Sequence, residues 1–142
     1  MARTVSGGMP VGFHYTPGVG NTAFFEALRD RGVLLGSRCT SCDRTYLPAR
    51  IFCERCFAAL EPDTECGPGG TLESFTVGHV GIDGEPLDEP APLGLVKLDQ
   101  ADTMLIHRLI GDGPWEVGSR VAAVIRADRT GSILDLEGFR SV

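Results

Sequence analysis

Two Cys-x2-Cys pairs carry the clearest chemistry in this 142-residue sequence. The first pair is Cys39 and Cys42, the second is Cys53 and Cys56, and ten residues separate the pairs. Two thiolates on one tight turn bind one side of a metal ion, and two such pairs complete a tetrahedral sulfur site. The spacer is shorter than the common length of about 15–20 residues, but a hairpin with Pro48 near its tip returns the second pair to the first. We therefore predict one metal site with these four ligands.

Zinc is the favoured metal, because four protein ligands leave no open coordination position for a substrate. The site is then structural and not catalytic. An iron centre of the rubredoxin type uses the same ligand set and is the less favoured alternative. Four thiolates with one zinc ion would change the formal net charge from -6 to about -8. The fifth cysteine, Cys66, lies outside the spacing and is interpreted as an inert, buried residue.

The N-terminal segment 1–20 is rich in glycine and proline and has no apolar period. Such a segment cannot bury itself, so we expect a flexible arm. Its aromatic cluster, Phe13 to Tyr15, would serve for docking onto a neighbour or onto the protein's own surface.

The segment 21–33 predicts a helix with Asn21 or Thr22 as its N-cap and Gly32 as its stop. A helix of about ten residues is marginal alone, so its apolar face must pack on another element. The cysteines follow in segment 34–66, which we predict to be a rubredoxin-like zinc ribbon.

The segment 67–142 changes to short strands separated by turns rich in glycine, proline and acidic residues. The five strands are expected at 71–80, 93–99, 103–110, 120–127 and 132–139. Residues 81–92 hold three prolines and four acidic residues, which predicts a long solvated loop. With no helical crossovers, the strands favour a closed antiparallel barrel of the OB type, with Trp115 and Val117 filling one end. A sandwich is the alternative. The predicted fold class is mainly β.

The chain has 13 basic and 19 acidic residues, and the whole excess of acid lies in the barrel half. Nucleic-acid affinity depends on contacts between cations and phosphates, so this balance disfavours DNA or RNA as a partner. No apolar run approaches the ~20 residues of a membrane span, and the N-terminus lacks an apolar leader. We expect a cytoplasmic protein, where thiols stay reduced.

Several sequence blocks together resemble the small zinc-ribbon plus OB-fold proteins that were first defined as a domain of unknown function and came to be regarded as acyl-CoA-associated partners of thiolases. The blocks are Phe24–Leu28, Arg38–Asp43, Tyr46–Arg50, Cys53–Cys56, Gly70–Val77 and Val117–Val121. The resemblance spans residues 21–140, and it is the combination of blocks that is specific.

This resemblance implies a non-catalytic accessory subunit beside a thiolase-like or hydroxymethylglutaryl-CoA-synthase-like enzyme, where it helps to form an acyl-CoA site. No catalytic residue is carried over from the family. Arg50, His107 and Arg108 are the candidate acyl-CoA contacts. The alternatives are a single-stranded nucleic-acid-binding module, which the resemblance also permits, and an iron redox carrier.

Overall fold

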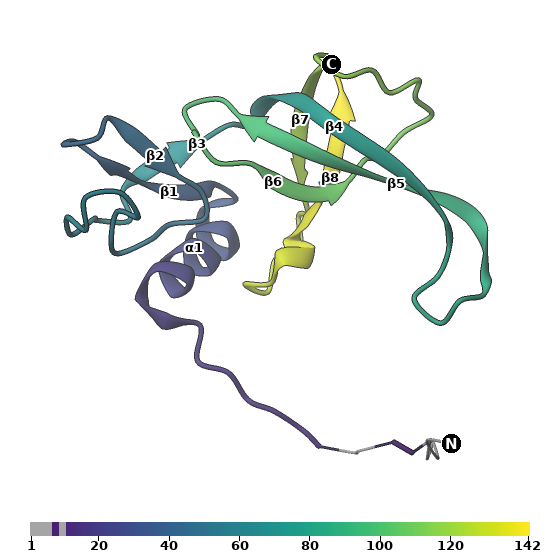
Figure 1. The fold of residues 1–142 in the computed structure, drawn as a ribbon, viewed down its shortest axis with the longest axis horizontal. Coiled ribbons are helices and arrows are strands. Elements are labelled where there is room, and N and C mark those ends of the chain that lie inside the picture. Colours follow the sequence, from purple (N-terminus) through teal and green to yellow (C-terminus); the bar gives the residue numbers. More distant parts are fainter. Residues whose placement is uncertain (1–6, 9–10) are drawn as a thin grey trace, which may run out of the picture.

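The computed structural model describes residues 7–8 and 11–142, and it shows a small cysteine-bearing sheet followed by a larger barrel (Figure 1). In the described part of the chain, one α-helix precedes both sheets. The elements in chain order are α1 (Gly18–Arg31), β1 (Leu34–Cys39), β2 (Arg44–Tyr46), β3 (Thr64–Cys66), β4 (Gly69–Val80), β5 (Pro86–Leu98), β6 (Leu105–Arg108), β7 (Arg120–Ile125), the 3-10 helix η1 (Ile133–Asp135) and β8 (Leu136–Ser141). The mainly β fold class is confirmed.

Helix α1 begins earlier than predicted, and neither Asn21 nor Thr22 is its N-cap. The cap position is Pro17, whose ring already holds φ at -69°, a helical value. The predicted stop is confirmed, because Gly32 has a φ of 67° and its N–H donates to the Leu28 carbonyl at 3.1 Å.

The predicted arm falls partly outside the described residues, at 1–6 and 9–10. Residues 7–8 and 11–17 are exposed and form no helix or strand. Within them, the rings of Phe13 and Tyr15 stack with their centroids 6.1 Å apart. Residues 18–20, which the prediction assigned to the arm, belong to α1.

The cysteine-bearing sheet has the order β2-β1-β3, with both pairings antiparallel. Strand β1 forms a hairpin with β2, in which Cys39 lies opposite Arg44. Strand β3 closes the other edge and leads directly into the barrel. The central strand of this sheet is therefore β1, with β2 and β3 on its two sides.

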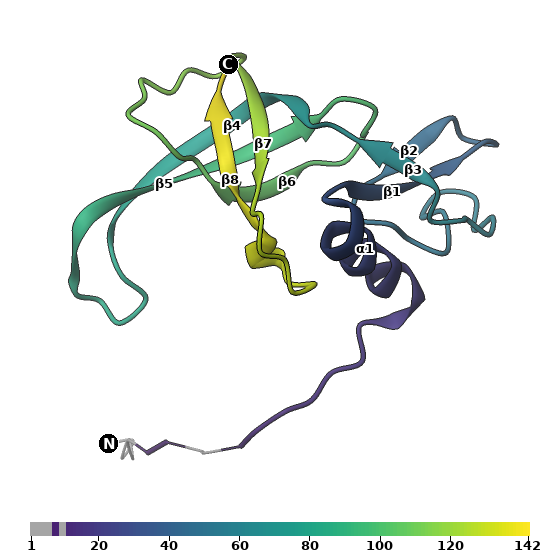
Figure 2. The same ribbon diagram turned by 180° about the vertical axis from the view of Figure 1, so that it is seen from behind.

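The barrel strands have the order β6-β5-β4-β7-β8, and the two outer strands meet to close the sheet (Figure 2). Closure occurs where Leu109 and Phe139 form a parallel bridge and the Ile110 N–H donates to the Phe139 carbonyl at 2.8 Å. A closed five-stranded barrel confirms the OB type over the sandwich. The predicted strand 132–139 is replaced at its start by η1, because Ser132 and Asp135 form a capping box there.

The prediction of a long loop at 81–92 is wrong, because β5 already begins at Pro86. Strands β4 and β5 form a long hairpin that projects beyond the barrel, and its turn is closed by the Gly81 N–H donating to the Glu85 carbonyl at 2.8 Å (Figure 1). Prolines are tolerated in this strand because its outer half pairs on one side alone.

The main hydrophobic core is shared by the helix, the base of the ribbon and the barrel. Its largest fully buried members include Phe24, Leu28, Leu72 and Phe139. Trp115 is half-buried and packs against this core. Val117 is 64% exposed, so its predicted role in filling the barrel end is wrong. The chain reverses at residues 116–119, where the Ser119 N–H donates to the Glu116 carbonyl, and the turn directs Val117 to solvent.

A polar connection holds the ribbon against the barrel. The Thr103 hydroxyl accepts from the Leu47 N–H at 2.7 Å and donates to the Leu47 carbonyl at 2.8 Å. Next to it, Asp102 accepts from the Thr45 N–H at 2.8 Å and its own N–H donates to the Thr45 carbonyl at 2.9 Å. The loop after β5 is thus bonded to β2 and to the residue that follows it.

Within the described ranges a bilayer-crossing helix is absent, since α1 is too short and too polar for that role.

Candidate metal centre

The four predicted cysteines converge at the far end of the ribbon. Their sulfur atoms all lie within 4.8 Å of one another. The Cys39 and Cys56 sulfurs are 3.6 Å apart, and the Cys42 and Cys53 sulfurs are 3.8 Å apart. A tetrahedral zinc ion with Zn–S bonds of about 2.3 Å requires sulfur separations of about 3.8 Å. The donor set therefore fits a four-coordinate metal ion.

Each cysteine pair lies on a turn that ends in a left-handed residue. Asp43, directly after Cys42, has a φ of 50°, and Phe57, directly after Cys56, has a φ of 60°. The second turn is closed by the Phe57 N–H donating to the Cys53 carbonyl at 3.0 Å. These reversals direct the two sulfurs of each pair to the same side.

Ionisation of all four cysteines would require a nearby cation. Hydrogen bonding with Cys56, together with burial, raises the pKa of Cys42 to about 12. Crowded sulfurs of this kind cannot all become thiolates alone, because like charges at such distances repel. A divalent metal supplies the positive charge that allows all four to ionise.

Tyr46 is a functional residue that the sequence analysis missed. Its side chain is fully buried, and its hydroxyl lies 3.2 Å from the Cys53 sulfur. The hydrogen bond that this hydroxyl donates lowers the pKa of Cys53 to about 6 and raises the pKa of Tyr46 to about 12. The guanidinium groups of Arg50 and Arg44 lie over the ring, at 5.0 and 5.8 Å from its centroid. Spacing in the sequence offers no signal for this contact, because folding of the segment 47–52, which forms no strand, brings the two residues together.

Cys66 takes no part in the cluster. It is buried at the end of β3, and burial raises the pKa of its thiol to about 11. A thiol that stays protonated at neutral pH is a poor nucleophile and a poor ligand. This agrees with its interpretation as an inert residue.

The three candidate acyl-CoA contacts lie in two separate places. Arg50 is on the ribbon, where its guanidinium donates to Glu54 at 2.8 Å. His107 and Arg108 line a small pocket of the barrel, which they share with Arg126 and Glu137. Burial lowers the pKa of His107 below its ordinary value, so the ring is neutral at pH 7. The structure does not bring Arg50 to this pocket, and contact of any of the three with a ligand stays a prediction.

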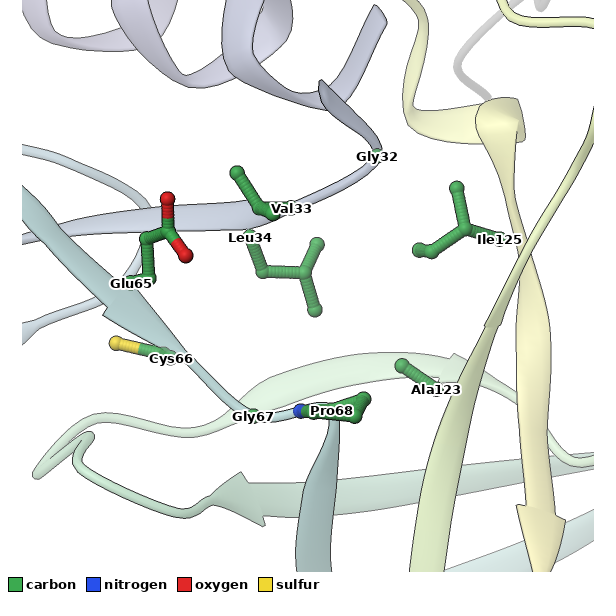
Figure 3. Close-up of a pocket in the computed structure, with 9 residues that line it drawn as sticks. All are labelled: Gly32, Val33, Leu34, Glu65, Cys66, Gly67, Pro68, Ala123 and Ile125. Atoms are coloured by element: carbon green, nitrogen blue, oxygen red, sulfur yellow. The ribbon is translucent and has the colours of Figure 1, made fainter.

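A cavity of about 150 Å³ lies at the junction of the helix, the ribbon and the barrel (Figure 3). Leu34 of the ribbon faces Ala123 and Ile125 of β7 across it, while the Cys66 sulfur points away from both. Its lining is mainly aliphatic. None of the predicted metal-binding or acyl-CoA-contacting residues lines it. The cavity is an apolar seam between the two domains.

Two family models match consecutive parts of the chain. The model described as "ChsH2, rubredoxin-like zinc ribbon domain" matches residues 27–61, and the one described as "ChsH2, C-terminal OB-fold domain" matches residues 63–126. The chain belongs to the ChsH2 family of zinc-ribbon plus OB-fold proteins, also called DUF35. The family assignment confirms the resemblance deduced from the sequence blocks.

Relatives of known structure or curated description are similar over most of their length. A DUF35 domain-containing scaffold protein of Methanocaldococcus jannaschii is 24% identical, and the match covers 70% of this chain and 72% of the relative. A DUF35 protein of unknown function from Sulfolobus solfataricus has a TM-score of 0.63 at 24% identity, covering 83% of this chain and 80% of that one. A chain of the structure described as "Ltp2-ChsH2(DUF35) aldolase" has a TM-score of 0.63 at 26% identity, covering 86% of this chain and 94% of that one.

Proposed function

We propose that this protein is a non-catalytic accessory subunit that binds a thiolase-like acyl-CoA enzyme and helps to form its acyl-CoA site. The observation that carries the proposal is the near full-length similarity to a chain of an Ltp2-ChsH2(DUF35) aldolase. The description of the Methanocaldococcus relative as a scaffold protein supports the same role.

The metal in this proposal is zinc, and its role is to fold the ribbon. Four protein sulfurs fill a tetrahedral shell, which leaves no position for a substrate. Zinc stabilises ribbons whose own apolar core is small, and here that core contains Cys39, Tyr46, Cys53 and Leu60. The bound metal would then keep the ribbon folded.

The nucleic-acid alternative is disfavoured by the positions of the barrel aromatics. OB folds that bind single strands stack bases on exposed aromatic rings inside a basic groove. Phe139 is fully buried, Trp115 is half-buried against the core, and Phe75 is 36% exposed. The barrel half also holds twice as many acidic as basic residues. The described barrel therefore offers neither a stacking platform nor the charge for binding phosphates.

Affinity capture of the tagged full chain from its native host tests the proposal. We expect a thiolase-like chain to co-purify, to be identified by its peptide masses, and to form a complex of fixed stoichiometry when both chains are produced together. The purified complex should turn over an acyl-CoA that the accessory chain alone leaves unchanged.

Two outcomes would contradict the proposal. One is capture that recovers no thiolase-like chain. The other is salt-sensitive retention of the free protein on single-stranded DNA, which would favour the nucleic-acid alternative. Absorption by bound iron in the natively purified protein would separately overturn zinc as the metal.

A further inference from the structure

The outer half of the β4–β5 hairpin has an open backbone edge. Strand β7 pairs with β4 at Gly69–Thr71, and Leu72 exchanges hydrogen bonds with residues 118 and 119. Beyond that point, in the part of the chain that the structure describes, β4 pairs with β5 alone. The stretch from Ser74 to Val80, here called the open edge, thus belongs to a strand with a neighbour on one side.

The register shows which backbone groups face the open edge. The Pro92 carbonyl accepts from the Leu109 N–H, so the backbone of Pro92 faces away from β4. In an antiparallel ladder, opposite residues either both face the shared ladder or both face away from it. Val77 lies opposite Pro92, so its N–H and C=O point to the open edge. Phe75, opposite Gly94, has the same orientation. These are two donors and two acceptors without a strand partner among the described residues.

The other edge of the same hairpin is blocked. Pro90 and Pro92 are two residues apart on β5, so the backbone of both faces away from β4. Proline has no N–H to offer an incoming strand there. Residues 74–80 of β4 contain no proline and no lysine or arginine, which are the usual devices that protect an edge. One edge of the hairpin is closed to strand addition, and the other is not.

The side chains around the open edge indicate the chemistry of its occupant. Phe75 and Val77 are 36% and 38% exposed and lie on one face of β4. The turn beyond them carries Asp83 and Glu85, and residues 74–95 contain four acidic residues and no lysine or arginine. An incoming strand would therefore meet apolar side chains along its length and negative charge at one end.

We propose that the open edge of β4 accepts an extended strand of the thiolase-like partner, whose apolar side chains pack on Phe75 and Val77 and whose lysines or arginines lie beside the acidic turn. This inference rests on the proposed function and names the surface that performs it. Strand addition supplies affinity through main-chain hydrogen bonds, and alternate side chains supply specificity.

Val77→Pro tests the strand addition directly. The Val77 N–H faces outward, so proline there removes no hydrogen bond of the hairpin itself but blocks an incoming strand. We expect the dissociation constant for the recombinant thiolase-like chain, measured by calorimetry with full-length proteins, to rise about tenfold or more. Val77→Ile keeps the N–H, the β-branched shape and the apolar surface, and it should bind like the parent protein. Matching far-UV circular dichroism of the three proteins establishes that the hairpin is intact.

Neutralising the acidic turn tests the charge of the occupant. The variant Asp83→Asn, Glu85→Gln, Asp88→Asn, Glu89→Gln should associate about threefold or more slowly at low salt and should lose most of its salt dependence. The matched control neutralises four exposed carboxylates elsewhere, at Glu61, Asp112, Glu116 and Asp128, and should retain the parent rate.

Different results would contradict the proposed function and the docking surface. If the parent protein binds no thiolase-like chain, the proposed function is wrong and the docking surface falls with it. If the parent binds one and Val77→Pro binds it equally well, the accessory role stands and the docking surface is wrong. Should Val77→Pro unfold, hydrogen exchange of the parent decides, because complex formation must then slow exchange at the Phe75 and Val77 amides.

Discussion

Removal of the metal should unfold the outer half of the ribbon and leave the rest of the molecule folded. The base of the ribbon packs into the main core through Leu34, Leu35, Leu47 and Ala49. The outer half has a separate small cluster that includes Cys39 and Cys53, with Cys42 packed against it. The loss of structure is therefore expected to be local, at the two cysteine turns and in residues 51–60.

The expected magnitude follows from this small cluster. Besides the cysteines, the buried members of this cluster are two large side chains, those of Tyr46 and Leu60. A large apolar side chain contributes about 1.5–3 kcal/mol on full burial, so two contribute about 3–6 kcal/mol. Structural zinc contributes about 10–16 kcal/mol in isolated zinc-finger peptides. The metal contribution exceeds the burial contribution, so burial alone does not hold the outer half together.

Hydrogen exchange read by mass spectrometry, before and after chelation, measures the effect. The amides of Cys53, Phe57 and Leu60 donate to carbonyls inside the outer ribbon and should lose protection. Peptides from β4 and β5 should keep theirs. Cys56→Ser should reproduce the loss, and Cys66→Ser, which leaves all four ligands in place, should not. Unchanged protection of residues 51–60 in a metal-free sample would refute the reasoning.

Two further predictions concern polar contacts outside the metal centre. Thr103→Val should destabilise the protein by about 1–3 kcal/mol in urea unfolding, because the Leu47 N–H and C=O both lose their partner; Thr103→Ser should restore most of this, and a valine variant of parent stability would contradict the role of the hydroxyl. For Asp135, burial opposes ionisation, but backbone N–H groups of residues 130–132 donate to the carboxylate and hold its pKa below the usual range. Since the unfolded pKa is near 3.9, its contribution is complete above that pH and is lost as the pH falls through the lower folded value. Asp135→Asn should flatten this part of the acid-unfolding profile, and a profile identical to that of the parent would exclude the carboxylate as its source.

The convergence of the four cysteines was predictable because its signal is local. Two residues between the cysteines of each pair set the turn, and the short spacer permits one way of bringing the pairs together. The Gly32 helix stop was predictable for a similar reason, since few other residues adopt a positive φ without strain. In each case the signal and its structural consequence lie within a few residues of one another.

The prolines at 86–92 predicted a loop, because proline breaks a strand in which both edges must pair. At an edge with one neighbour it costs no ladder hydrogen bond, and which edge lacks a neighbour depends on where β6 and β7 end. The exposed backbone edge at Phe75 and Val77 was unpredictable for the same reason. Their outward-facing backbone groups follow from the register of three strands, and local composition contains no trace of that register.

The sequence by itself determined the four-cysteine cluster, the mainly β fold class and the acidic balance of the barrel half, because residue type and short spacing encode these properties. The tertiary structure alone decided that Tyr46 donates to Cys53, that Thr103 joins the ribbon to the barrel, and that one edge of the long hairpin stays open. Each of these features depends on residues from different elements of the fold. Pairing between distant segments is set by all the strands together, so local sequence does not encode it.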